Sequence, residues 1–177
     1  MKGGLPFSAD RLRPILGLVQ TIVCSLPCNP LTIIRAYRIT NNSGLFDPTC
    51  YQTQLTKPLS SGQDPLVHFL TTDVETRADP HPLFDTAYYL TQCPDVAEQG
   101  INPLLHFLQT GWLEGQSPHL LFDAPYYLDR YPDVAEQGIN PLLHFIRFGL
   151  EEERQCHLLF DAPYYLDRYP DVAEQGI

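Results

Sequence analysis

Apolar and polar positions follow a repeating order along this chain, and the stretch from Leu121 to Gly149 shows it most clearly. Apolar residues at helical spacing follow an opening Leu-Phe-Asp, which predicts a helix with Asp123 as its N-cap and Pro125 in its first turn. Phe122 precedes the cap and stands opposite Tyr127, which is the spacing of a hydrophobic staple. The pattern therefore predicts that each unit begins with a capped helix.

Two further helical segments follow this first helix. Residues 132–137 are long enough for a short helical elbow, and Gly138 behind them is the favoured residue for a left-handed helix end. Asn140 then predicts the cap of a third segment, with Pro141 at its first position. This segment carries a broad apolar stripe made of Leu142, Leu143, Phe145, Ile146 and Phe148.

The same order recurs every 38 residues, because Leu-Phe-Asp begins at residues 45, 83, 121 and 159. A fixed period between about 20 and 50 residues indicates a repeat architecture. The chain divides into a leader (1–44), repeat 1 (45–82), repeat 2 (83–120), repeat 3 (121–158) and a half repeat (159–177). Repeat 1 is divergent, since Thr56-Lys57-Pro58 stands where repeat 2 has Pro94-Asp95-Val96. Thr72-Asp73 likewise replaces Thr110-Gly111.

The predicted fold class is all-α, because two-residue alternation is absent and prolines recur where strands would need N–H donors. Each unit is expected to hold two helices joined by the elbow. One unit exposes a wide apolar surface, so the units are expected to stack as a short solenoid-like array. The leader is expected to be helical and to cover one end of that array.

Composition and charge narrow the function classes. The chain has 177 residues, of which 44% are apolar and 18% charged, as expected for globular domains. The formal net charge is -10, and the repeats carry most of the acidic residues, so nucleic acid is not an expected partner. None of the 5 cysteines recurs in two repeats, which argues against a copied disulfide or metal framework. A reducing, cytoplasmic or membrane-peripheral location is favoured over secretion. The apolar run at residues 15–26 is too short to cross a bilayer.

Polar residues recur at the same positions in successive units, and helix architecture accounts for most of them. The 6 histidines form two rows, His68, His106 and His144 in the third segment and His81, His119 and His157 near the end of the unit. No second histidine or cysteine follows three or four residues later, so we interpret each imidazole as a packed ring whose nitrogen bonds a neighbouring turn, with no metal. The other repeated positions expected to be structural are Asp85, Asp123, Asp161, Tyr89, Tyr127, Tyr165, Asn102, Asn140, Gly100 and Gly138.

Motifs of catalysis are missing from the sequence. It contains no Asp-x-Asp, no phosphate-binding glycine loop, no His-Glu-x-x-His and no Gly-x-Ser-x-Gly. We therefore predict no catalytic residue, no cofactor and no metal ligand in this chain.

The unit LFDxxYYLxxxPDVAEQGINPLLHFLxxGW resembles tandem units that flank catalytic domains in bacterial glycosyltransferases of cell-surface polysaccharide synthesis. The resemblance covers residues 44–177 and includes a leader that ends in Ser-Gly-Leu-Phe-Asp. It implies a non-catalytic interaction or scaffold module that belongs to a longer parent enzyme. The matching region is not the catalytic part of such enzymes, so the resemblance implies no catalytic residue here.

The expected partners are other repeats, a catalytic domain of a parent chain, or a protein or glycan acceptor. The half repeat carries a first helix and elbow without a third segment, so self-association through its uncovered tyrosines is also expected. Two alternatives stay open at this point: a glycosyltransferase in its own right, and a secreted, calcium-associated surface repeat protein.

Overall fold

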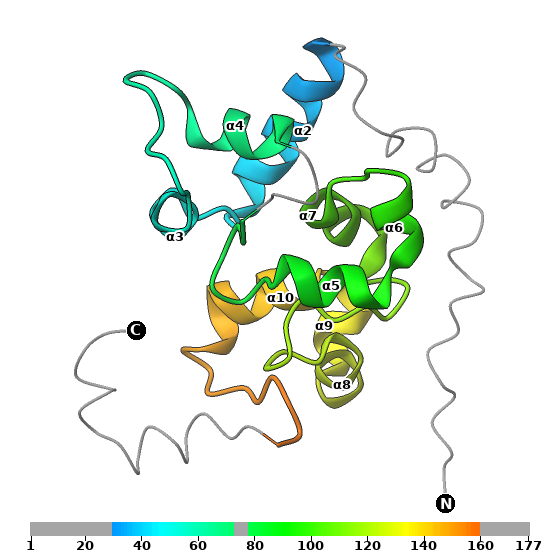
Figure 1. The fold of residues 1–177 in the computed structure, drawn as a ribbon. Coiled ribbons are helices and arrows are strands. Elements are labelled where there is room, and N and C mark those ends of the chain that lie inside the picture. The colour runs from blue at the N-terminus through cyan, green and yellow to red at the C-terminus, as the bar shows by residue number, and fades with distance from the viewer. Residues whose placement is uncertain (1–29, 73–77, 160–177) are drawn as a thin grey trace, which may run out of the picture.

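The computed structural model describes residues 30–72 and 78–159, and Figure 1 shows its ribbon. Within these two ranges the regular structure is helical, and the only extended pairings are two isolated bridges, His81–Phe84 and His119–Phe122. The predicted all-α class is therefore confirmed. Asp161, Tyr165 and the expected self-association of the half repeat lie outside the described residues.

Repeat 2 shows how the predicted caps become helices. Its elements are α5 (Thr86–Gln92), the elbow α6 (Pro94–Glu98), α7 (Pro103–His106) and the π-helix η3 (Phe107–Gly111). Asp85 caps α5 by accepting a hydrogen bond from the backbone N–H of Tyr88. Asn102 caps α7 by accepting one from the N–H of Leu105. Both side chains satisfy N–H groups that a first helical turn leaves without an intrahelical partner.

Repeat 3 repeats this arrangement with the same local causes. Its elements are α8 (Ala124–Arg130), the elbow α9 (Pro132–Gln137), α10 (Pro141–His144) and the π-helix η4 (Phe145–Gly149). Asp123 and Asn140 cap α8 and α10. Gly138 ends the elbow at φ 62° and ψ 32°, the left-handed conformation that glycine adopts without a Cβ clash.

The third segment departs from the single apolar stripe that the sequence predicts. In both complete repeats its first turn is α-helical and its second is a π-helix, whose wider turn changes which side chains face inward. Phe145 is buried, whereas Phe148, which was predicted to lie in the stripe, is 51% exposed. The prediction for Phe148 is wrong because it assumed a regular α-helix through this position.

Repeat 1 has the first and last helices of a unit without the elbow. Its elements are α3 (Pro48–Thr53) and α4 (Pro65–Thr71). In the other repeats, the middle of the elbow carries a buried valine, Val96 or Val134. The equivalent residue of repeat 1, Pro58, is exposed. Repeat 1 therefore lacks the apolar anchor that holds an elbow helix against the unit.

The last residues of each repeat are hydrogen-bonded to the start of that repeat. The backbone N–H of Asp85 donates to the Pro118 carbonyl at 3.0 Å, and Asp123 donates to Cys156 at 2.9 Å. Asp47 and Pro80 make the same bond in repeat 1 at 2.8 Å. These three bonds join equivalent positions, so the end of every unit is tied to the start of its own first helix.

The aromatic core of a unit also lies inside that unit. In repeat 2 the rings of Phe84, Tyr89 and Phe107 pack against one another with centroids 5.3 to 5.9 Å apart. All three side chains have no exposed surface. Aromatic clusters of this kind supply much of the buried apolar area of a small unit.

The leader helix α2 (Pro30–Ser43) joins the units together. It packs against α4 of repeat 1 and against α7 and η3 of repeat 2, and Figure 1 shows it beside these helices. Ala36, Thr40 and Ser43 are the buried residues of its inner face. Arg147 of repeat 3 donates to the carbonyls of Asn42 and Ser43 at the end of α2.

This arrangement bears on the predicted stacking. Among the described residues, the extensive helix–helix contacts lie within one repeat or involve α2. Direct stacking of equivalent helices, as in a solenoid, stays a prediction.

Candidate functional site

A buried tyrosine meets a histidine in every described repeat. Tyr89 Oη lies 2.7 Å from His106 Nδ1, and Tyr127 Oη lies 2.9 Å from His144 Nδ1. The first of these tyrosines comes from α5 and the second from α8, and the histidines come from α7 and α10. Repeat 1 has the equivalent pair, Tyr51 and His68, at 2.7 Å. A constant separation of 17 residues therefore links the first helix of a unit to its last.

The glycine that ends each π-helix makes room for this pair. A Cβ on Gly111 would lie 1.9 Å from Tyr89 Oη, and one on Gly149 would lie 2.7 Å from Tyr127 Oη. Neither glycine has a positive φ, so glycine is needed at these positions for the space that it leaves and not for its backbone conformation. Repeat 1 has Asp73 at this position in the sequence, and its helix α4 ends earlier, at Thr71.

The second row of histidines is held by the backbone. Leu83 N–H donates to His81 Nδ1 at 3.1 Å, and Leu121 N–H donates to His119 Nδ1 at 3.0 Å. Leu159 and His157 repeat the bond at 3.0 Å. A backbone N–H can only donate, so Nδ1 is the acceptor and the neutral ring carries its proton on Nε2. In this row, Nδ1 accepts its hydrogen bond from the backbone of the turn that contains the histidine itself.

Burial keeps several of these groups neutral. It lowers the pKa of His106, although Glu114, whose Oε2 lies 3.7 Å from His106 Nε2, acts in the opposite direction. Burial also lowers the pKa of His81 and His144. The same loss of hydration raises the pKa of Tyr89 well above its ordinary value. At physiological pH, a neutral tyrosine and a neutral imidazole therefore share a hydrogen bond that serves the structure.

The remaining repeated positions lie at helix ends. Asp85, Asp123, Asn102 and Asn140 are N-caps. Gly100 and Gly138 have φ angles of 64° and 62° directly after the elbows. Asp95 and Asp133 occupy the first turn of an elbow, where the helix dipole favours a negative charge.

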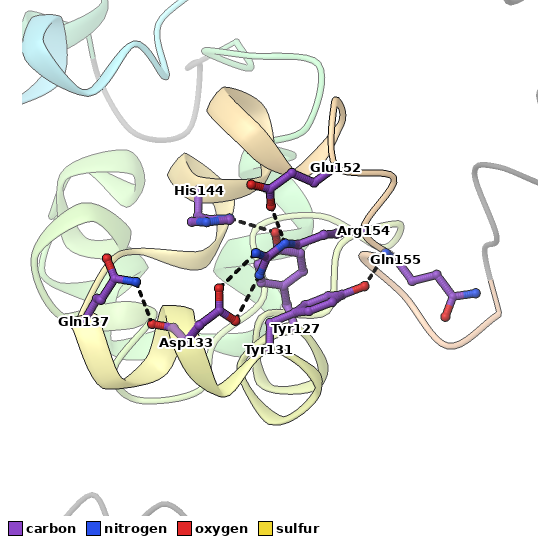
Figure 2. A network of polar contacts seen from close by, with 8 residues as sticks. All are labelled: Tyr127, Tyr131, Asp133, Gln137, His144, Glu152, Arg154 and Gln155. Atoms are coloured by element: carbon purple, nitrogen blue, oxygen red, sulfur yellow. Dashed lines mark hydrogen bonds and ion pairs between the residues drawn. The ribbon is translucent and has the colours of Figure 1, made fainter.

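Repeat 3 carries one polar cluster that the other repeats lack, and Figure 2 shows it. Arg154 donates to both carboxylate oxygens of Asp133, at 3.1 and 2.9 Å, and also to Glu152. Its guanidinium lies over the Tyr131 ring, 4.7 Å from the centroid. The hydrogen bond from Arg154 and, after it, backbone hydrogen bonds hold the pKa of Asp133 low, and the carboxylates of Asp133 and Glu152 hold the pKa of Arg154 high. Arg154 is thus fully engaged within repeat 3 and is poorly placed to bind an external anion.

A hollow lies between the leader helix and repeat 1, which we call the α2–α4 hollow. Its volume is about 180 Å³. Its lining includes Tyr37 and Asn41 of α2, Phe46 and Pro48 at the start of α3, and Asp64 and Leu66 at the start of α4. Tyr37 Oη donates to Asp64 Oδ2 at 3.1 Å across its mouth.

Sequence reasoning missed both the hollow and the tyrosine–histidine pairing. The pairing had a signal, because a tyrosine and a histidine keep the same separation in every unit. The hollow also had one: Asp64 stands where repeats 2 and 3 have Asn102 and Asn140. A carboxylate in place of an amide at a repeated position marks a place where the units differ.

In residues 30–72 and 78–159, no three histidine, cysteine or acidic side chains are placed to hold one metal ion. No helix in the described part of the chain is long and apolar enough to cross a bilayer. The chain matches no protein-family model, no curated protein and no solved structure.

Proposed function

We propose that this chain is a non-catalytic helical-repeat module that positions a glycosyltransferase of bacterial surface-polysaccharide synthesis or its acceptor. The resemblance of the 38-residue unit to units beside such catalytic domains supports the assignment of context. The absence of catalytic motifs from the sequence supports a binding role.

One structural observation carries the choice of binding over catalysis. Nδ1 of each of the 6 histidines makes a hydrogen bond within the fold, either to a tyrosine hydroxyl of its own repeat or to the backbone N–H of the residue two positions later. A general base needs a nitrogen within reach of substrate and a pKa near the working pH. Imidazoles that are bonded within the fold, three of them with a pKa lowered by burial, suit the folding of a repeat better than proton transfer.

The repeated carboxylates support the same conclusion. Asp47, Asp85 and Asp123 accept hydrogen bonds from the first turns of α3, α5 and α8. Their positions follow from helix capping, and none of them lines the α2–α4 hollow. A catalytic pair would place two carboxylates around one substrate-sized space.

The test is a turnover assay with the full chain. Uridine, guanosine and cytidine sugar nucleotides are incubated with and without Mg²⁺ or Mn²⁺, and release of nucleotide is followed. We expect no release above the uncatalysed rate. Release that is abolished by Asp64→Asn but retained in Asp85→Asn would overturn the proposal, because it would identify a non-repeated carboxylate as catalytic.

The association itself is tested by copurification. The tagged chain and a glycosyltransferase encoded beside it are expressed together, and the partner is measured after purification with and without residues 45–158. We expect recovery of the enzyme to depend on the repeats. Equal recovery without them would contradict a positioning role.

A further inference from the structure

The α2–α4 hollow presents one carboxylate beside aromatic and proline side chains. Asp64 Oδ1 accepts hydrogen bonds from the backbone N–H groups of Leu66 and Val67, at 2.8 and 3.0 Å. Asp64 Oδ2 accepts the Tyr37 hydroxyl. A carboxylate has about four acceptor positions, so roughly one remains. The carboxylate is therefore held in place by the protein and can still accept from a ligand.

The polar groups around the hollow act mainly as acceptors. Tyr37 and Asn41 stand four residues apart on α2 and so share one face of that helix. The Tyr37 oxygen keeps acceptor capacity after donating to Asp64, and the Asn41 amide offers a carbonyl oxygen. A ligand with several N–H or O–H donors fits such a set, and an anion does not.

The charge at this place is particular to repeat 1. Asn102 and Asn140 occupy the equivalent position in the other repeats, where they are 4% and 7% exposed. Asp64 is exposed, and Phe46 beside it is only half-buried, whereas the equivalent Phe84 is fully buried. The first unit thus opens a charged, partly apolar space where the second is closed and neutral.

This carboxylate makes no ion pair with a described side chain. Within residues 30–72 and 78–159, the ion pairs join His106 to Glu114 and Arg154 to Asp133 and Glu152. The chain as a whole is strongly acidic, with a formal charge of -10, which raises the local concentration of cations. A divalent metal would need about six oxygen ligands, and the hollow supplies one carboxylate.

From this geometry we propose that the α2–α4 hollow binds a primary alkylammonium group. The ammonium head donates to Asp64, Tyr37 and Asn41, and its methylene stem lies against Phe46 and Pro48. Three donors on the head match the three acceptors, and a stem that buries its methylenes against apolar atoms is how lysine side chains pack. The proposal goes beyond the proposed function and holds whether or not the chain serves a glycosyltransferase.

The chain offers a matched substitution for the test. Asp64→Asn removes the charge but keeps an N-cap, because asparagine caps the equivalent helices α7 and α10. Asp85→Asn makes the same change at a cap that does not line the hollow. The two variants should have the same far-ultraviolet circular dichroism spectrum as the wild type.

The probe is n-butylammonium chloride, titrated into the ¹⁵N-labelled full chain at constant ionic strength. We expect saturable shifts of the Asn41 and Leu66 amide signals, with a Kd on the order of millimolar, as is usual for so small a ligand. Asp64→Asn should weaken binding at least tenfold, whereas Asp85→Asn should not change it. Tyr37→Phe, which removes one acceptor and leaves the cap intact, should weaken it severalfold.

Three results would overturn the proposal. They are no saturable shift in the wild type, equal binding by Asp64→Asn, and binding of n-butanol or methyl glucoside as tight as that of the amine. The last result would assign the hollow to hydroxyl groups. A lysine-containing peptide with blocked termini and the free amine are compared to distinguish a protein side chain from a small metabolite as the source of the ammonium group.

Discussion

Repeat 1 and repeat 2 share a tyrosine, a histidine and two phenylalanines, yet only repeat 2 forms a closed unit. Both place the tyrosine hydroxyl 2.7 Å from Nδ1 of the histidine. Repeat 2 continues into an elbow and a π-helix, and neither is present in the described residues of repeat 1, 45–72 and 78–82. His106 is buried as a result, whereas His68 is only half-buried.

This difference separates the residues that join the helices from those that close the unit. The aromatic residues and the tyrosine–histidine bond are enough to pack the first helix against the last. Closure depends on the buried elbow valine, on Gly111 over the tyrosine hydroxyl and on a neutral cap at Asn102. Repeat 1 replaces all three, with Pro58, Asp73 and Asp64, and it is also the unit with the α2–α4 hollow.

The largest effect is expected where the closed units are tightest. Gly111→Ala gains about 1 kcal/mol of helix propensity, but its Cβ would lie 1.9 Å from Tyr89 Oη, so overpacking and the broken hydrogen bond dominate. We expect a loss of about 3 kcal/mol in the free energy of unfolding, measured by urea denaturation. Gly149→Ala, with 2.7 Å to Tyr127 Oη, should lose less.

A second variant shows whether the hydroxyl is the cause. Tyr89→Phe in the Gly111→Ala background removes the nearest clashing atom, so the double variant should lose less than the sum of the single losses. Additive losses, or a Gly111→Ala protein as stable as the wild type, would contradict this account of the repeated glycine.

The next largest effect is expected from loss of a tyrosine hydroxyl, and it should be larger in the buried Tyr89–His106 pair than in the Tyr51–His68 pair, whose histidine is half-buried. Tyr89→Phe leaves His106 Nδ1 buried without its partner, which should cost about 1–3 kcal/mol. Tyr51→Phe should cost less than about 1 kcal/mol, because water can reach the half-buried His68. Amide hydrogen exchange in α7 and α4 assigns each loss to its repeat. Equal losses would show that closure of the unit does not matter to the pair.

Acid should destabilise the closed units. His81, His106 and His144 have a lowered pKa in the folded chain, so the folded state binds fewer protons than the unfolded state near pH 6. The contribution of these histidines to the free energy of unfolding is complete above about pH 6.5, and it is lost as the pH falls through the lowered pKa values. Denaturation midpoints between pH 7.5 and 5 should fall, and His106→Gln should reduce the slope. A flat profile would contradict neutral burial.

The smallest effect is expected from the arginine cluster of repeat 3. Arg154→Gln restores the residue that repeat 2 carries at this place, Gln116. The partner carboxylates Asp133 and Glu152 are 50% and 45% exposed, so the loss should be about 0.2–1 kcal/mol and should shrink in 1 M salt. A larger, salt-independent loss would show that the cluster holds the repeat closed.

Local signals in the sequence were enough to predict the helix ends and not enough to predict the contacts between helices. The caps Asp85 and Asp123 and the left-handed Gly138 depend on a few neighbouring residues. The π-helices and the contact of Arg147 with the end of α2 depend on packing between distant segments. The tyrosine–histidine pair falls between these cases. Its constant spacing can be seen in the sequence, but the fold is needed to show that the two side chains contact each other.

The central claim of the proposed function is that the repeated histidines stabilise the fold of the units and take no part in catalysis. Long-range ¹H–¹⁵N spectra of the imidazole rings between pH 5 and 8 test this most directly. We predict Nε2-protonated rings for His81 and His119, because Nδ1 accepts a hydrogen bond from a backbone N–H in each. His81, His106 and His144 should titrate below pH 6.5. Nδ1-protonated rings, or midpoints at or above the ordinary value, would contradict the claim.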